Sequence, residues 1–257
     1  MDSAPLLQLN GITKRHGADA ALAGVSLAVP AGTLLALVGP SGSGKTTLLK
    51  TINRLVEPDE GSVVLAGEDV RAIPAASLRR RIGYVFQGIG LFPHLDVAEN
   101  IAIVPRLTGA GAAERRARAL ELLDLVALPR DFASRYPAAL SGGQAQRVGV
   151  ARALAAEPSL MLMDEPFGAL DPVTRDELGR AYRALHERLG LTTIMVTHDM
   201  AEALLLADRI VVLIDGRIRA DGPPASLLRG DGDAGVRALI EVPRRQAERL
   251  AALERGG

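Results

Sequence analysis

The chain has 257 residues, of which 48% are hydrophobic and 23% charged, which is enough for a full hydrophobic core and fits one large domain or one domain with an inserted part. Its formal net charge of zero offers no general attraction to nucleic acid, so we expect no nucleic-acid partner. It contains no cysteine, which excludes disulfides and thiolate metal sites.

The N-terminal residues MDSAPLLQLN lack the basic region and apolar run of a signal peptide. No later stretch has the roughly 18 to 20 uninterrupted apolar residues that a membrane span requires. These two features predict a cytoplasmic location.

Residues 6–12 and 21–29 have apolar positions at strand-like spacing on either side of a polar loop, which predicts a β-hairpin. His16 lies in that loop. It either lays its ring on a nucleotide base or is an exposed histidine without a role, and its position leaves both interpretations open.

Residues 34–52, LLALVGPSGSGKTTLLKTI, predict a buried strand, a glycine-rich turn and a helix that begins at Lys45. The turn matches the phosphate-binding pattern GxxxxGK[S/T], in which glycines let backbone N–H groups surround a phosphate and the helix N-terminus attracts it. Thr46 offers a hydroxyl to magnesium. The residues expected to bind nucleotide here are Gly39, Pro40, Ser41, Gly42, Ser43, Gly44, Lys45, Thr46 and Thr47. The residues expected on the apolar helix face are Leu48, Leu49, Ile52, Leu55 and Val56.

Further strands are predicted at 62–65 and 82–86, and the second is followed by Gln87. Open α/β sheets place their chemistry at the carboxyl ends of strands, which favours a functional glutamine. Composition alone favours a loop glutamine that faces water.

The pattern changes after residue 91, where two prolines precede the strongly helical run AAERRARALELLDLVAL. Glu114 lies four residues before Arg118, the favourable order for an ion pair on a helix. We interpret residues 91 to about 155 as a helical insertion into a nucleotide-binding core.

Within that insertion, LSGGQ at 140–144 begins a helix with Ser141 as its N-cap. Glycines at a helix start are unfavourable by about 1 kcal/mol each relative to alanine, so Gly142 and Gly143 require a reason. An anion that approaches the bare N–H groups is one reason, and a flexible helix start without a ligand is the other.

The apolar run 160–163 is followed by Asp164 and Glu165, two carboxylates that are costly at the end of a buried strand unless they meet cations or polarise water. Because side chains alternate along a strand, Asp164 can point toward a metal while Glu165 points toward a water molecule. A strand at 192–197 likewise precedes His198.

The C-terminal part has a predicted hairpin, 210–214 and 217–220, joined by an Asp-Gly turn. GDGDAG at 230–235 predicts a flexible joint. We expect the remaining residues to form a short helical tail, 231–257, that Pro243 breaks.

Taken together, these motifs resemble the ATP-binding cassette (ABC) family, and LSGGQ between the phosphate loop and the DE strand is the discriminating motif. The resemblance implies an α/β P-loop NTPase core of ABC type, with an antiparallel β subdomain and an inserted helical subdomain, over residues 1–230. It also implies binding of ATP and Mg2+. The family most often has Tyr or Phe at the adenine-stacking position that His16 takes here.

Resemblance to the family also implies a role for each motif. Gln87 and His198 act with the catalytic Glu165, and Thr46, Gln87 and Asp164 surround the magnesium ion. A second copy, or a paired ATPase subunit, closes the nucleotide site with its signature motif, LSGGQ, and with its D-loop, the segment that contains Asp171. The residues concerned are Ser141, Gly142, Gly143, Gln144 and Asp171.

The segment YVFQGIGLFPHLDVAENIAIVP is similar to the importer branch for quaternary ammonium osmoprotectants such as glycine betaine, choline and carnitine. This similarity implies the ATP-hydrolysing subunit of an importer, held at the cytoplasmic face of the plasma membrane by integral permease subunits and served by a separate solute-binding protein. One alternative is an ATPase for another solute, such as an amino acid or a polyamine. Another is a non-transport ABC protein that acts on ribosomes or DNA.

Overall fold

The computed structural model of the chain describes residues 4–17, 19–229 and 234–255. Its strands are β1 (Leu7–His16), β2 (Asp19–Val29), β3 (Leu34–Val38), β4 (Glu60–Leu65), β5 (Glu68–Asp69), β6 (Ile82–Val85), β7 (Leu160–Asp164), β8 (Thr193–Val196), β9 (Arg209–Ile214) and β10 (Arg217–Gly222). Its α-helices are α1 (Lys45–Ile52), α2 (Ala75–Arg80), α3 (Val97–Ile101), α4 (Ile103–Leu107), α5 (Ala112–Leu125), α6 (Gly142–Leu154), α7 (Pro172–Leu189), α8 (Met200–Leu206), α9 (Pro224–Leu228) and α10 (Ala234–Arg255). Short 3-10 turns lie at Val70–Ala72, Arg130–Ser134 and Pro137–Ala139.

The larger sheet has the strand order β10-β9-β3-β8-β7-β6. Its strands β9, β3, β8, β7 and β6 run parallel, and β10 pairs antiparallel with β9 at the edge. The carboxyl ends of β3, β6, β7 and β8 therefore meet at one edge of the sheet. The phosphate loop, Gln87, the two carboxylates and His198 each follow one of these strands, so the topology brings them together.

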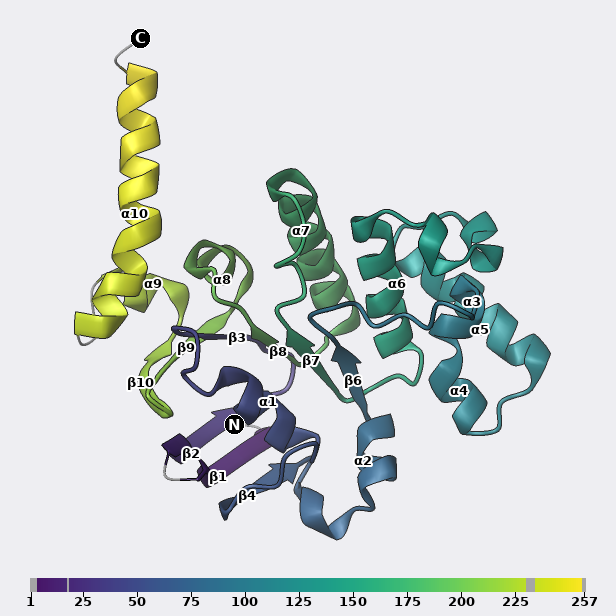
Figure 1. Cartoon of the computed structure of the whole chain (residues 1–257), viewed down its shortest axis with the longest axis horizontal. Helices are drawn as coiled ribbons and strands as arrows, with labels where there is room; N and C mark the ends of the chain where they lie inside the picture. Colours follow the sequence, from purple (N-terminus) through teal and green to yellow (C-terminus); the bar gives the residue numbers. More distant parts are fainter. Residues whose placement is uncertain (1–3, 18, 230–233, 256–257) are drawn as a thin grey trace.

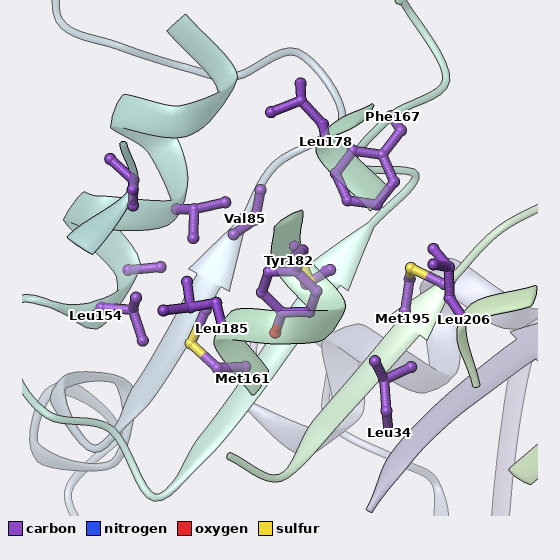
Figure 2. Packing of buried hydrophobic residues seen from close by; sticks show 14 of the residues in the cluster. Leu34, Val85, Leu154, Met161, Phe167, Leu178, Tyr182, Leu185, Met195 and Leu206 are labelled. Carbon is purple, nitrogen blue, oxygen red and sulfur yellow. The ribbon is translucent and has the colours of Figure 1, made fainter. Parts of the chain in front are cut away.

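Alternation along β3 assigns its side chains to two hydrophobic cores. Leu34, Ala36 and Val38 belong to the core between this sheet and α6, α7 and α8, whereas Leu35 and Leu37 belong to the core that contains α1. Figure 2 shows the first core, in which Met161 and Met195 of the sheet face side chains of the covering helices. Both faces of the central strands β3, β7 and β8 are buried, which explains why these strands are nearly continuous apolar runs.

The second sheet is antiparallel, with the order β2-β1-β4-β5, and its β1–β2 pair confirms the predicted N-terminal hairpin. It packs on the far side of α1 from the parallel sheet (Figure 1). A P-loop core, an antiparallel sheet and a group of helices are all present, so the predicted fold class is confirmed.

Helices α3, α4, α5 and α6 connect β6 to β7 and gather on one side of the molecule (Figure 1, right). The expected pair between Glu114 and Arg118 is wrong. The Glu114 carboxylate instead accepts a hydrogen bond from the backbone N–H of Gly111 at 3.3 Å, capping its own helix, and Arg118 forms ion pairs with Glu121 and Glu157. The unpaired N–H groups at the helix start compete for the carboxylate.

The predicted apolar face of the first helix is too long, because α1 ends at Ile52. Asn53 caps the helix and Arg54 has a φ of 56°, so the chain leaves the helical path and Leu55 is 48% exposed. A positive φ stops the 3.6-residue periodicity on which that prediction depended.

Pro243 does not break the C-terminal helix, which corrects the expectation for this segment. α10 runs through it for 22 residues, and Val236 and Ile240 near its start are buried. A proline removes one backbone hydrogen bond, but the turns on either side keep theirs. Beyond its start α10 projects away from the rest of the molecule (Figure 1, yellow). Of the predicted joint at 230–235, residues 230–233 lie outside the described residues. Within the described ranges, no helix has the length and hydropathy needed to cross a membrane.

Candidate functional site: a cavity at the carboxyl edge of the parallel sheet

A cavity of about 600 Å³ lies where the parallel strands end. It collects residues from five separate segments of the sequence, and all of them were predicted as site residues except Ala21. The residues that line it are His16, Ala21, Ser41, Gly42, Ser43, Gly44, Lys45, Thr46, Thr47, Gln87, Glu165 and His198. The structure therefore brings the phosphate loop, the glutamine, the glutamate and the histidine to one place.

The phosphate loop is closely packed against the β1–β2 hairpin. Gly44 caps α1 with a φ of 100°, and a Cβ at this position would collide with the backbone carbonyl of Ala21. Only glycine fits, for conformational and for steric reasons. This packing holds the loop against the hairpin, and the loop presents the N-terminus of α1 to the cavity.

Lys45 is 7% exposed and folds back on the loop. Its ammonium group donates hydrogen bonds to the carbonyls of Gly39 at 2.8 Å and Pro40 at 2.7 Å. Burial lowers the pKa of Lys45, and the nearby carboxylates of Glu165 and Asp164 act in the opposite direction. A phosphate oxygen carries a negative charge and would therefore bind the Lys45 ammonium group more strongly than these two neutral carbonyls do.

Thr46 and Asp164, two of the three residues predicted to surround magnesium, face each other. The Thr46 hydroxyl donates a hydrogen bond of 3.1 Å to Asp164 Oδ1, and Tyr84 Oη lies 3.5 Å from Oδ2. Burial raises the pKa of Asp164, and the bond from Thr46 and the charge of Lys50 oppose this effect. A buried carboxylate of this kind gains stability when a cation is placed beside it.

The side chains of Gln87 and His198 both contact the carboxylate of Glu165. Glu165 Oε2 accepts a hydrogen bond of 3.0 Å from the Gln87 side-chain amide and lies 3.2 Å from His198 Nδ1. The backbone of Glu165 has a φ of 46°, an unfavourable conformation for a non-glycine residue, and it turns the chain directly after β7. One carboxylate oxygen of Glu165 is thus contacted by two side chains that lie just after two other strands, β6 and β8.

The remaining nucleotide-binding predictions concern residues that do not line the cavity. Ser141 is the N-cap of α6 and forms a capping box with Gln144, and Asp171 caps α7 by accepting hydrogen bonds from the backbone of Val173 and Thr174. Among the described residues, the cavity is lined neither by the Ser141–Gln144 segment nor by Asp171. Within a single chain, the residues that line the cavity are therefore separate from the Ser141–Gln144 segment and from Asp171.

Packing accounts for one of the two glycines at the start of α6. A Cβ on Gly143 would lie 2.7 Å from Thr174 Cγ2, whereas one on Gly142 would lie 3.4 Å from the nearest side-chain atom, in Leu170. Close approach of α6 to α7 is a reason that neither of the two sequence interpretations included.

Sequence reasoning missed two residues beside the site. Tyr84 contacts Asp164, and a tyrosine within an otherwise apolar strand was its only signal. Arg175 donates to the carbonyls of Gly168 and Leu170 and lies 3.5 Å from Asp199, so it ties the segment after Glu165 to the helix after His198. No sequence pattern indicated this connection.

The side chains at this site can supply only part of the coordination shell of a magnesium ion. In the part of the chain that the structure describes, no group of three or more His, Asp or Glu residues could hold a metal ion. Thr46 and Asp164 supply two oxygens, which suits Mg2+ because this ion commonly takes one or two protein ligands and completes its shell with phosphates and water. The predicted third ligand, Gln87, contacts Glu165 here, and its role as a metal ligand stays a prediction.

Comparison with known proteins agrees with this geometry. The chain is 48% identical over 236 residues to the choline transport ATP-binding protein OpuBA of Bacillus subtilis (strain 168), an alignment that covers 91% of this chain and 62% of OpuBA. It is also 48% identical over 238 residues to the sulfate/thiosulfate import ATP-binding protein CysA of Bradyrhizobium diazoefficiens, covering 91% of this chain and 68% of CysA. The chain thus spans about three fifths of the length of OpuBA-like relatives.

Among solved structures, the dimeric post-hydrolysis state of the ATP-binding cassette MJ0796, bound to ADP and Pi, superposes with a TM-score of 0.75 at 36% identity. The match covers 85% of this chain and 98% of that one. The sequence model that describes ABC transporters matches residues 22–168, which include the phosphate loop, the signature and the two carboxylates. The chain belongs to the ABC transporter family.

Proposed function

We propose that this chain is the ATP-hydrolysing subunit of an importer, that it works as a head-to-tail pair, and that its solute is a quaternary ammonium compound such as choline or glycine betaine. It acts at the cytoplasmic face of the plasma membrane, bound to permease subunits and supplied by a separate solute-binding protein. Residues 1–230 form the nucleotide-binding domain in this proposal, and residues 231–257 form a C-terminal tail.

One observation carries the proposal: the cavity unites Lys45, Glu165 and His198 but leaves the capped start of α6 at Ser141 elsewhere. A helix N-terminus with a serine hydroxyl is suited to an anion. The Ser141 of a second copy can meet the open side of the cavity, so that ATP joins two subunits. The dimeric form of the cassette MJ0796, described with ADP and Pi, supports such a pair.

Five residues in and beside the cavity each have a defined task in this proposal. Lys45 exchanges its two carbonyl partners for phosphate oxygens, and Thr46 and Asp164 hold Mg2+, which would neutralise charge on the phosphates. Glu165 orients or deprotonates the attacking water molecule. His198 contacts the terminal phosphate and senses its presence.

His16 is at the end of β1 on the rim of the same cavity, and it is exposed. A flat ring at this position can stack on the adenine of a nucleotide whose phosphates lie in the loop. We propose this role for His16, because stacking requires no hydrogen-bond partner and tolerates an exposed side chain.

A second surface suits the permease. Near the segment that follows Gln87 lies a groove of about 470 Å³ with apolar side chains from several elements, including Phe86, Phe92 and Leu107, which are 45%, 43% and 67% exposed. Exposed apolar clusters of this kind mark binding surfaces for other proteins. Its proximity to Gln87 would allow movement at the nucleotide cavity to reach the membrane partner.

The solute is supported by similarity to OpuBA and by the segment 84–105. The chain has only four Phe, three Tyr and no Trp, so we assign recognition of a quaternary amine to the separate binding protein. The equal identity to CysA favours a second candidate, an importer of a different solute.

A mixing experiment tests the paired site. Lys45→Ala damages the phosphate loop and Ser141→Arg damages the signature, so each variant alone should lose ATP hydrolysis. In a head-to-tail pair of one variant with the other, both damaged surfaces share one site and the second site is intact. We expect the mixture to regain phosphate release, and a mixture as inactive as either variant alone would contradict the pairing.

A reconstitution experiment tests the solute. The chain is co-purified from membranes with its permease subunits and binding protein, and ATP hydrolysis is measured in liposomes. We expect choline or glycine betaine to stimulate hydrolysis and sulfate to leave it unchanged. Stimulation by sulfate alone would favour the second candidate.

A further inference from the structure

A second cavity, separate from the nucleotide site, lies between α6 and α7. It has a volume of about 270 Å³ and is bounded by α6, α7, Phe167 and the residues at the end of α5. We call it the α6–α7 cavity. Four of its apolar wall residues, Phe167, Leu178, Tyr182 and Leu185, are labelled in Figure 2.

One buried polar group in this wall lacks a partner. Gln146 of α6 lines the cavity and is 2% exposed, and its Nε2 atom has no hydrogen-bond partner among the described residues. Leaving a buried amide unpaired is unfavourable, and native proteins rarely do so without a reason. A ligand with a hydrogen-bond acceptor would satisfy this donor.

Two arginines give the cavity a positive character. Arg147 and Arg188 line it, and each donates to a carbonyl at the end of α5, to Val126 at 3.0 Å and to Leu125 at 3.3 Å. These bonds hold the guanidinium groups in place while each keeps further N–H donors. Among the described residues, no carboxylate lines the cavity to neutralise them. An anionic head group would fit this arrangement.

The size and the opening of the cavity limit the ligand. A cavity of roughly 150 Å³ already accepts benzene, so this larger one has room for a fused ring system. The exposed side chains of Ala181 and Arg188 are part of its lining, which shows that it reaches the surface. The ligand can therefore enter with its apolar body inward and its charge beside the arginines.

We propose that the α6–α7 cavity binds a small organic anion with a flat apolar body, of the class of aromatic carboxylates, and that its occupation changes the rate of ATP hydrolysis. The second half of this proposal rests on the proposed function. Gln146 and Arg147 lie in the helix that Ser141 caps, and Phe167 follows Glu165 by two residues. A ligand bound between α6 and Phe167 would fix the position of α6 relative to the segment that follows Glu165.

The binding test uses nucleotide-free protein and the fluorescent probe 8-anilinonaphthalene-1-sulfonate, with indole-3-acetate as competitor. We expect saturable binding of one probe per chain, displaced by indole-3-acetate. Ala181→Leu narrows the opening and Arg188→Gln removes one charge, and each should raise the probe Kd by at least about fivefold, as expected when one charge-assisted contact or its space is lost.

Two control variants locate the probe. Arg180→Gln removes an arginine of α7 that pairs with Asp176 on the exposed side, and Leu107→Ser alters the other apolar groove. Both should bind the probe like the wild type. The site is refuted if Ala181→Leu and Arg188→Gln bind like the wild type, if Leu107→Ser abolishes binding, or if no saturable binding occurs.

Gln146→Met gives an independent readout. It nearly keeps the volume of the side chain and removes the unpaired Nε2 donor, so the melting temperature should stay equal or rise while indole-3-acetate binds more weakly. A large fall in melting temperature would mean that the amide has a structural partner, against the proposal.

The effect on hydrolysis is tested last. Indole-3-acetate should change the rate of phosphate release by the wild type and not by Ala181→Leu. No change in the wild type, with binding intact, overturns the regulatory half alone. ATP binding measured without any probe reports on the proposed function by itself, since none of these variants touches the nucleotide cavity.

Discussion

Thr46 and Asp164 are 118 positions apart in the chain, yet the Thr46 hydroxyl donates a hydrogen bond of 3.1 Å to the Asp164 carboxylate. The contact joins the start of α1 to the end of β7. It forms because β3 and β7 run parallel on either side of β8, so the turns after them leave the same edge of the sheet.

Asp164→Asn should weaken binding of ATP in the presence of Mg2+ by at least about tenfold, the lower end of the effect of disturbing the surroundings of a metal ligand. Binding in the presence of a chelator should change little, because the phosphate loop is unaltered. Calorimetric titration with and without Mg2+ measures both. Asp215→Asn, an exposed acid in the β9–β10 turn, is the matched control. Equal affinities of Asp164→Asn and the wild type in Mg2+ would argue against the metal site.

Glu165→Gln should keep ATP binding and slow turnover by about 10² to 10⁴, the usual range for loss of a general base. The amide keeps the size of the carboxylate but cannot accept a proton from water. Phosphate release under single-turnover conditions gives the rate. Glu177→Gln, an exposed residue of α7, should hydrolyse ATP at the wild-type rate. Wild-type turnover by Glu165→Gln would remove Glu165 from its assigned role.

Gly143→Ala should destabilise the protein by about 1 to 3 kcal/mol, the usual cost of overpacking, despite the better helix propensity of alanine. The added methyl group would lie 2.7 Å from Thr174 Cγ2. The double variant with Thr174→Ser removes that methyl group, keeps the hydroxyl and should recover most of the loss. Urea unfolding measures each free energy. If Gly143→Ala alone is as stable as the wild type, close packing is not the reason for this glycine.

His186 should make stability depend on pH. It is 2% exposed, and its ring contacts Thr193 Oγ1 at 3.1 Å and the carbonyl of Gly32 at 3.3 Å. Burial lowers its pKa, while the Gly32 carbonyl and the charge of Asp208 act in the opposite direction. Between the lowered pKa of the folded state and the ordinary value of 6.5, the unfolded chain binds more protons.

The free energy of unfolding should therefore fall as the pH decreases below 6.5, and the loss should level off below the folded-state pKa. Its slope from this residue is at most about 1.4 kcal/mol per pH unit. His186→Gln should show a shallower dependence, and subtracting the two urea-unfolding series between pH 5 and pH 8 isolates the contribution of His186. Parallel series would show that His186 does not titrate differently on folding.

Local sequence determined the elements that depend on near neighbours. The glycines and lysine of the phosphate loop specify a strand, turn and helix in direct succession, and Ser141 and Gln144 specify a helix start through a capping box. The Asp-Gly turn specifies the C-terminal hairpin. In each case the interacting groups lie within a few residues, so the chain order carries the information.

Tertiary structure decided which of these pieces meet. The alignment of parallel strands places Gln87 and His198 on the same oxygen of Glu165, and the packing of α6 on α7 leaves no room for a Cβ at Gly143 unless Thr174 shifts. Competition between partners also decided that Glu114 caps a helix instead of pairing with Arg118. Such contacts depend on distances between residues that are far apart in sequence. Periodicity and local motifs describe only near neighbours, so they could not predict these contacts.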